Sequence, residues 1–144
     1  MEPILPLDSA EVFFDGIFSE PRLRHPEGIA IDASGDIWCG GETGEIYRIS
    51  ADGSGIEAVA STDGFILGLA FDTDGNLYIS CYEPSRIYRV SPEGETLLFI
   101  DDPIAHTLCH PTNCAFRGEE LFTSNLGRWH ITRIEARSEG LALP

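Results

Sequence analysis

The chain has 144 residues, of which 42% are hydrophobic, with 15 glycines, 9 prolines and a formal net charge of −15. This length and composition predict one turn-rich domain with a sizeable apolar core. The negative charge argues against nucleic acid and membranes as partners, because both carry negative charge themselves. No apolar run is long enough to span a membrane, and the N-terminus lacks the features of a secretory signal, so we expect a cytoplasmic protein.

Short strand signals alternate with turn signals along the whole chain, and no apolar period of helical length occurs. The sequence therefore predicts an all-β protein. In chain order, the expected strands of the first part of the chain are 11–14, 28–32, 36–40, 45–50 and 56–60. The same order of elements recurs from 68 to 100, and more loosely from 113 to 135.

This recurrence is an internal repeat. Ala30, Ala70 and Ala115 occupy the same place in three similar segments and lie 40 and 45 residues apart. A period near 40 with several short strands per unit is typical of β-propeller blades. We expect about three four-stranded blades in one domain of residues 1–144, and their bounds are about 26–60, 66–100 and 111–135.

The third blade lacks an outer strand of its own, and the apolar segment 11–14 has the right character to complete it from the N-terminus. Closed propellers typically have about four to eight blades. Three blades would form an open arc with two exposed apolar flanks, and such flanks are interaction surfaces or aggregation sites.

Three motifs resemble one known family. They are His25-Pro26-Glu27-Gly28-Ile29-Ala30-Ile31-Asp32, Gly75-Asn76-Leu77-Tyr78 and His110-Pro111-Thr112-Asn113-Cys114-Ala115-Phe116. In this order they resemble blades of the senescence marker protein (SMP-30), gluconolactonase and luciferin-regenerating enzyme family, over about residues 11 to 142. The resemblance implies a partial β-propeller of the gluconolactonase type, in which the middle blades of a six-bladed family fold are missing.

The resemblance also implies a function. Family enzymes hold one divalent cation (Ca, Mg, Mn or Zn) at the mouth of the central channel, where it polarises the carbonyl of a small-molecule lactone or ester for attack by water. Glu27 matches the family's glutamate ligand. Asn113 is a second candidate metal ligand, although Thr112 occupies the matching position. His25 and His110 are weaker candidates for binding substrate.

One family residue is missing, and this leaves the enzyme assignment open. The aspartate that serves the family as ligand and general base aligns with Leu67. The alternative is a non-catalytic propeller fragment or binding module with an incomplete metal site. A homodimer would complete a six-bladed ring and place two copies of Glu27 across one channel.

The four cysteines show no CxxC pair and no regular framework, so we expect reduced thiols rather than disulfides. His106, Cys109, His110 and Cys114 could ligate zinc, but their spacing is not that of a recognised four-ligand site. A loop with two packed thiols is the alternative explanation for this cluster.

Overall fold

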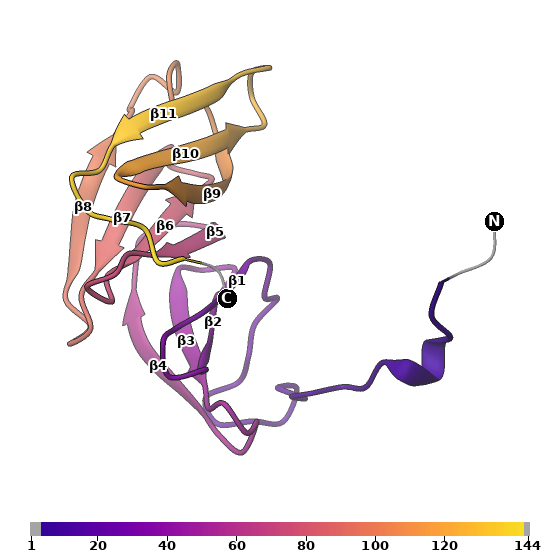
Figure 1. Cartoon of the computed structure of the whole chain (residues 1–144). Coiled ribbons are helices and arrows are strands. Elements are labelled where there is room, and N and C mark those ends of the chain that lie inside the picture. The colour runs from indigo at the N-terminus through magenta and orange to yellow at the C-terminus, as the bar shows by residue number, and fades with distance from the viewer. Residues whose placement is uncertain (1–3, 143–144) are drawn as a thin grey trace.

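The computed structural model describes residues 4–142 and shows an all-β chain whose sheets are stacked as blades (Figure 1). A short 3-10 helix, η1 (Leu7–Ser9), precedes the strands. In chain order the strands are β1 (Ile29–Ile31), β2 (Ile37–Gly40), β3 (Glu45–Ile49), β4 (Ile56–Ser61), β5 (Ile66–Phe71), β6 (Leu77–Cys81), β7 (Arg86–Val90), β8 (Thr96–Asp101), β9 (Pro111–Arg117), β10 (Glu120–Asn125) and β11 (Ile131–Glu135).

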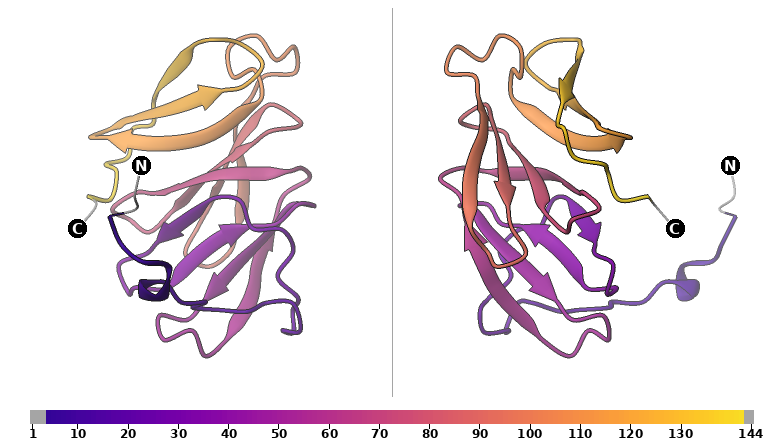
Figure 2. Two further views of the ribbon diagram at one scale, coloured as in Figure 1. Left: turned by 90° about the vertical axis from the view of Figure 1, so that its right-hand side faces the viewer. Right: turned by 60° about the vertical axis from the view of Figure 1, so that its left-hand side comes forward.

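The strands form three antiparallel sheets, each made of consecutive strands. Blade 1 has the order β1-β2-β3-β4, blade 2 has β5-β6-β7-β8, and blade 3 has β9-β10-β11. The blades follow one another in an arc, with blade 2 between the other two (Figures 1 and 2). The predicted all-β propeller class is confirmed.

Blades 1 and 2 have the same kind of turn between their first two strands, because an aspartate and a glycine occupy the same places in both turns. In the β1–β2 turn the carboxylate of Asp32 accepts hydrogen bonds from the backbone N–H groups two and four residues on, at 2.8 and 3.1 Å. Asp72 does the same in the β5–β6 turn, at 3.0 and 2.8 Å. Gly35 and Gly75 follow with φ of +88° and +82°, which favours glycine. The repeat in the sequence therefore reflects the same turn, with the same aspartate hydrogen bonds and glycine, in both blades.

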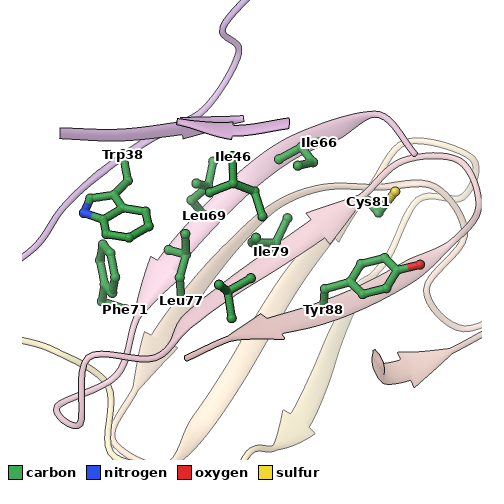
Figure 3. Packing of buried hydrophobic residues seen from close by; sticks show 10 residues of the cluster. Trp38, Ile46, Ile66, Leu69, Phe71, Leu77, Ile79, Cys81 and Tyr88 are labelled. Atoms are coloured by element: carbon green, nitrogen blue, oxygen red, sulfur yellow. The ribbon is translucent and has the colours of Figure 1, made fainter. Parts of the chain in front are cut away.

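An apolar layer joins blades 1 and 2 (Figure 3). Trp38 packs edge-on against Phe71, with ring centroids 5.5 Å apart. The buried side chains that fill this layer include Ile46, Ile66, Leu69, Leu77 and Ile79. Burying side chains of this size contributes roughly 1.5–3 kcal/mol each, so the layer is a main source of the free energy of folding.

A second apolar layer joins blades 2 and 3, with Tyr78 at its centre. The Tyr78 ring makes T-shaped contacts with Phe99 and Phe116, each at 5.1 Å between centroids. Its hydroxyl donates to Ser138 Oγ at 3.1 Å. Leu121 and other buried side chains complete the layer, so each blade rests on the next through aromatic and aliphatic packing.

The predicted completion of blade 3 by residues 11–14 is wrong for the single chain. These residues form no strand, and blade 3 has three strands. Phe13 lies against Gly53 instead, and Phe14 packs with Leu23 on the flank of blade 1 that faces away from blade 2. Blade 2 stands between this flank and β11, so the segment cannot reach the third sheet of its own chain (Figure 1).

The C-terminal segment after β11 ties the blades together. The backbone N–H of Gly140 donates to the carbonyl of Gly118 in blade 3, and that of Leu141 donates to the carbonyl of Phe71 in blade 2, both at 2.9 Å. The side chain of Leu141 packs against the apolar layer between blades 1 and 2. The last described residues thus contact all three blades. No helix among residues 4–142 is long and apolar enough to cross a membrane.

Candidate functional site

The inner strands β1, β5 and β9 lie side by side and line an open hollow. Each is the first strand of its blade, and β5 contacts both of the others. One part of the hollow, about 330 Å³, is lined by Glu27, Gly28, Ile29, Leu67, Leu69, Thr112 and Asn113. A neighbouring apolar part, about 280 Å³, shares Ile29, Leu69 and Asn113 with it and extends to Phe71, Phe116 and Leu141. The hollow is therefore polar at one end and apolar at the other.

Two glycines allow the inner strands to approach this closely. A Cβ added at Gly28 would lie 1.9 Å from the Leu67 carbonyl oxygen. A Cβ added at Gly68 would lie 2.4 Å from the Asn113 Cα. Any side chain at these positions would push the strands apart. These contacts bring Glu27 and Asn113, which are 86 positions apart in the sequence, to one hollow.

The polar end of the hollow offers oxygen atoms of several kinds. Glu27 is exposed and is the one carboxylate among the described residues that line it. The Thr112 hydroxyl lies 3.1 Å from Ser124 Oγ. The Asn113 side-chain oxygen accepts a hydrogen bond from the backbone N–H of Cys114 at 2.9 Å. Leu67 presents a partly buried aliphatic side chain where the family pattern has an aspartate.

The two predicted substrate-binding histidines lie outside this hollow. His25 is exposed with φ of 42°, and its Nδ1 lies 2.5 Å from a carboxylate oxygen of Glu42. His110 packs on the ring of Tyr82, with centroids 4.7 Å apart, and its Nδ1 lies 3.0 Å from the Tyr82 carbonyl oxygen. Both side chains are engaged locally and neither lines the hollow.

The possible zinc cluster is not assembled. Across residues 4–142, no three or more His, Cys, Asp or Glu side chains gather closely enough to hold a metal ion. Cys114 is buried between blades 2 and 3, and its thiol points to the Tyr78 carbonyl at 3.6 Å. Burial raises the pKa of this thiol to about 12. The four cysteines are free thiols.

The sequence analysis did not identify the walls of the hollow. Leu69 and Phe71 of β5 and Phe116 of β9 line its apolar part, together with consecutive residues of the same strands. The apolar character of these strands is visible in the sequence, but the contact between β5 and β9, which belong to neighbouring blades, does not follow from the sequence of either strand.

The fold and the hollow define the chain as part of a β-propeller, with its inner strands set to line a central channel. Comparison with known proteins shows which families the chain is similar to. The family model described as strictosidine synthase-like, N-terminal, matches residues 18–49. Regucalcin from Sus scrofa is 35% identical over 54 residues, which are 37% of this chain and 17% of the relative. Regucalcin from Gallus gallus is 33% identical over the same shares.

Solved structures share the fold at lower identity. A gluconolactonase by family assignment gives a TM-score of 0.65 at 20% identity, covering 82% of this chain and 41% of that one. A luciferin-regenerating enzyme gives 0.61 at 18%, covering 84% and 48%. Virginiamycin B lyase from Staphylococcus aureus gives 0.62 at 19%, covering 81% and 40%.

The predicted relationship to the senescence marker protein, gluconolactonase and luciferin-regenerating enzyme family is confirmed. The matched region is only a small part of the curated relatives, and this chain spans less than half of each solved structure compared above.

Proposed function

We propose that this protein hydrolyses lactones or esters with the help of a divalent cation held at Glu27. The observation that supports this proposal is the placement of Glu27, Thr112 and Asn113 around one hollow between the inner strands. The relationship to the gluconolactonase family supports the same substrate class. An open hollow with one polar end and one apolar end suits a small ring compound with a carbonyl group.

The atoms at the polar end are oxygen donors of the kind that a hard cation prefers, but there are few of them. Carboxylate, hydroxyl, amide and backbone carbonyl oxygens are the ligands of Ca²⁺ and Mg²⁺, and Ca²⁺ takes six to eight of them. Among its described residues, a single chain supplies one carboxylate to this hollow. A second copy that closed the ring would bring a second Glu27 toward the same channel, so we propose that the homodimer is the active form.

The residues around the hollow have distinct roles in this proposal. A bound divalent cation would polarise the carbonyl of the substrate and lower the pKa of a bound water. Glu27 would hold the cation, and the aliphatic side chains of Ile29 and Leu69 would orient the substrate ring. Leu67 cannot accept a proton, so proton acceptance would fall to a carboxylate of the second copy.

The test is turnover of a sugar lactone and an aryl ester by the metal-stripped protein, before and after addition of Ca²⁺, Mg²⁺, Mn²⁺ or Zn²⁺. Glu27→Gln should lower metal-stimulated turnover by about 100-fold or more, since it removes the charged ligand. Glu42→Gln is the matched control, because Glu42 is an exposed carboxylate outside the hollow. Absence of turnover with every cation would contradict the proposal.

A binding module is the second candidate, and Leu67 in the hollow favours it. A propeller fragment without the family's base could hold a ligand at the polar end without reacting with it. Such a module would bind a lactone or its acid without consuming it, and Glu27→Gln would weaken that binding. Isothermal titration with a lactone, beside a turnover assay on the same sample, distinguishes the two candidates, because only the module would bind the lactone and leave it intact.

A further inference from the structure

Each blade has two faces, and the strand pairing shows that the same types of residue recur on the corresponding face of all three blades. Residues directly opposite each other on neighbouring strands share one face of a sheet. An aromatic residue stands opposite an arginine in each blade, as Trp38–Arg48, Tyr78–Arg89 and Phe122–Arg133. Two residues along, a small residue stands opposite an isoleucine, as Gly40–Ile46, Ser80–Ile87 and Ser124–Ile131. We call this repeated surface the forward face of a blade.

The forward face is buried in two blades and open in the third. Trp38 and Ile46 of blade 1 are 5% and 0% exposed in the layer against blade 2, and Tyr78 and Ile87 of blade 2 are both fully buried against blade 3. In blade 3, Ile131 at the equivalent position is 64% exposed. Blade 3 therefore ends in the same docking surface without a blade to cover it.

The opposite surface is the rear face, and it also repeats. Leu77 opposite Val90 packs blade 2 onto blade 1, and Leu121 opposite Ile134 packs blade 3 onto blade 2. The equivalent pair in blade 1 is Ile37–Ile49, in an apolar cluster with Cys39 and Tyr47. This rear face of blade 1 has no blade against it. It is covered in part by Phe14 and Leu23, which are themselves only half-buried.

The N-terminal arm, residues 4–18, runs beside this rear face, and its first part, which includes η1, stands away from the blades (Figures 1 and 2). It presents exposed apolar side chains, with Ile4, Leu7, Val12 and Phe18 at least 80% exposed. Within residues 4–142, blade 3 is one strand short, and its outer strand β11 pairs with β10 alone. A free edge strand and a loose apolar segment are complementary, because a strand can add to an open sheet edge.

Charge supports the same match. Residues 4–20 carry Asp8, Glu11, Asp15 and Glu20 and no basic residue. Arg128 and Arg137 flank β11 at its two ends, and within the strand Arg133 pairs with Glu120 and lies two residues from Glu135. Attraction of an acidic arm to these arginines would partly offset the repulsion between two chains that each carry a net charge of −15.

We infer that the forward face of blade 3 docks on the rear face of blade 1 of a second copy, whose residues 11–14 add as the fourth strand beside β11. Two such contacts, related by a two-fold axis along the channel, close a ring of six blades. Two copies give a blade number within the usual four to eight, whereas three copies would give nine. Docking requires Phe14 and Leu23 to shift from the rear face toward the β11 edge.

This inference specifies the surfaces of the homodimer in the proposed function, but its test does not depend on catalysis. The measurement is absolute mass by light scattering on a sizing column, for a chain of 15.8 kDa. Wild-type protein at tens of micromolar is expected to elute as a dimer. A dimer without lactone turnover would refute the proposed function and leave this inference standing.

Substitutions separate the forward face from other exposed apolar residues. Ile131→Asp should weaken dimerisation by about 30-fold or more, as expected for a central contact of an interface. Leu98→Asp is the matched control, since Leu98 is 51% exposed on β8 of blade 2, the middle blade, which takes no part in the inferred contact between copies. Both variants should melt as folded monomers at low concentration, because neither side chain is buried in the single chain.

A second pair of variants tests the exchanged strand. Val12→Pro removes a backbone N–H within segment 11–14 and should weaken the dimer by about tenfold. Ile4→Pro, in the same arm but outside this segment, should not. A wild-type monomer at all concentrations, species larger than a dimer, or an Ile131→Asp variant that dimerises normally would each overturn the inference.

Discussion

Gly68 is the position where one added methyl group tests the packing of the inner strands most directly. It is buried in β5, and a Cβ there would lie 2.4 Å from the Asn113 Cα, 2.5 Å from Ser80 Oγ and 2.7 Å from the backbone nitrogen of Cys114. Two of these three atoms belong to the backbone of β9. Because they cannot rotate away, Gly68→Ala must move β9 away from β5.

The expected cost of this overpacking is about 1–3 kcal/mol in the free energy of unfolding. For a domain of this size, each kcal/mol lowers Tm by about 2–4 °C, so the melting temperature should fall by about 2–12 °C. Gly55→Ala is the control, because a Cβ at Gly55 would meet nothing within 4 Å. That variant should be neutral or slightly more stable, since alanine restricts the unfolded chain.

Urea denaturation and near-ultraviolet circular dichroism measure the two variants side by side. The dichroism of Tyr78 and its aromatic neighbours should also change in Gly68→Ala, because β9 carries Phe116. If Gly68→Ala and Gly55→Ala unfold at the same urea concentration, the close approach of β5 and β9 is refuted.

Two further predictions concern buried groups. Tyr78→Phe removes the hydrogen bond to Ser138 but keeps the ring contacts, so it should lower the free energy of unfolding by about 0.5–1.5 kcal/mol in urea denaturation. Tyr78→Ala should lower it by about 3–5 kcal/mol, and equal losses for the two variants would contradict the described packing. Burial raises the pKa of the Cys39 and Cys81 thiols to about 11, so at pH 8 they should react with a thiol reagent only as fast as the protein unfolds. Thiols of the unfolded chain ionise near pH 8.5, so these two groups should leave stability unchanged below pH 8 and lower it as the pH rises from about 9 to 11. If the urea midpoint at pH 10.5 equals that at pH 7, the raised pKa of these two thiols is refuted.

Much of the fold could be predicted from local sequence signals. Gly35 and Gly75 mark the same turn in two blades, and the alternating apolar residues around them predict the strands that follow. These signals are local because a hairpin is fixed by its own turn residues and side-chain alternation.

The position of the N-terminal segment could not be predicted in this way. Glu11 to Phe14 has the composition of a strand, but a strand needs an accessible edge to pair with. In the single chain the nearest surface is the rear face of blade 1, where Phe14 packs on Tyr47 and its neighbours. The choice between that surface and β11 depends on the arrangement of whole blades.

The candidate site was also only partly predictable. The motif around Glu27 and the position of Asn113 were visible in the sequence, and the structure places both residues at one hollow. The local engagement of His25 with Glu42 and of His110 with Tyr82 was not visible, because it depends on loops that meet in three dimensions.

The contact of Leu141 with the layer between blades 1 and 2 has a consequence for synthesis of the protein. Both blades are complete at Asp101, but a residue that packs on their shared core is made 40 positions later. At about 5–20 residues per second, translation takes about 2–8 seconds to cover that distance. During this interval Trp38 and Phe71 lack the cover of Leu141, so chaperones should be able to bind this apolar layer of the nascent chain until residue 141 has emerged from the ribosome.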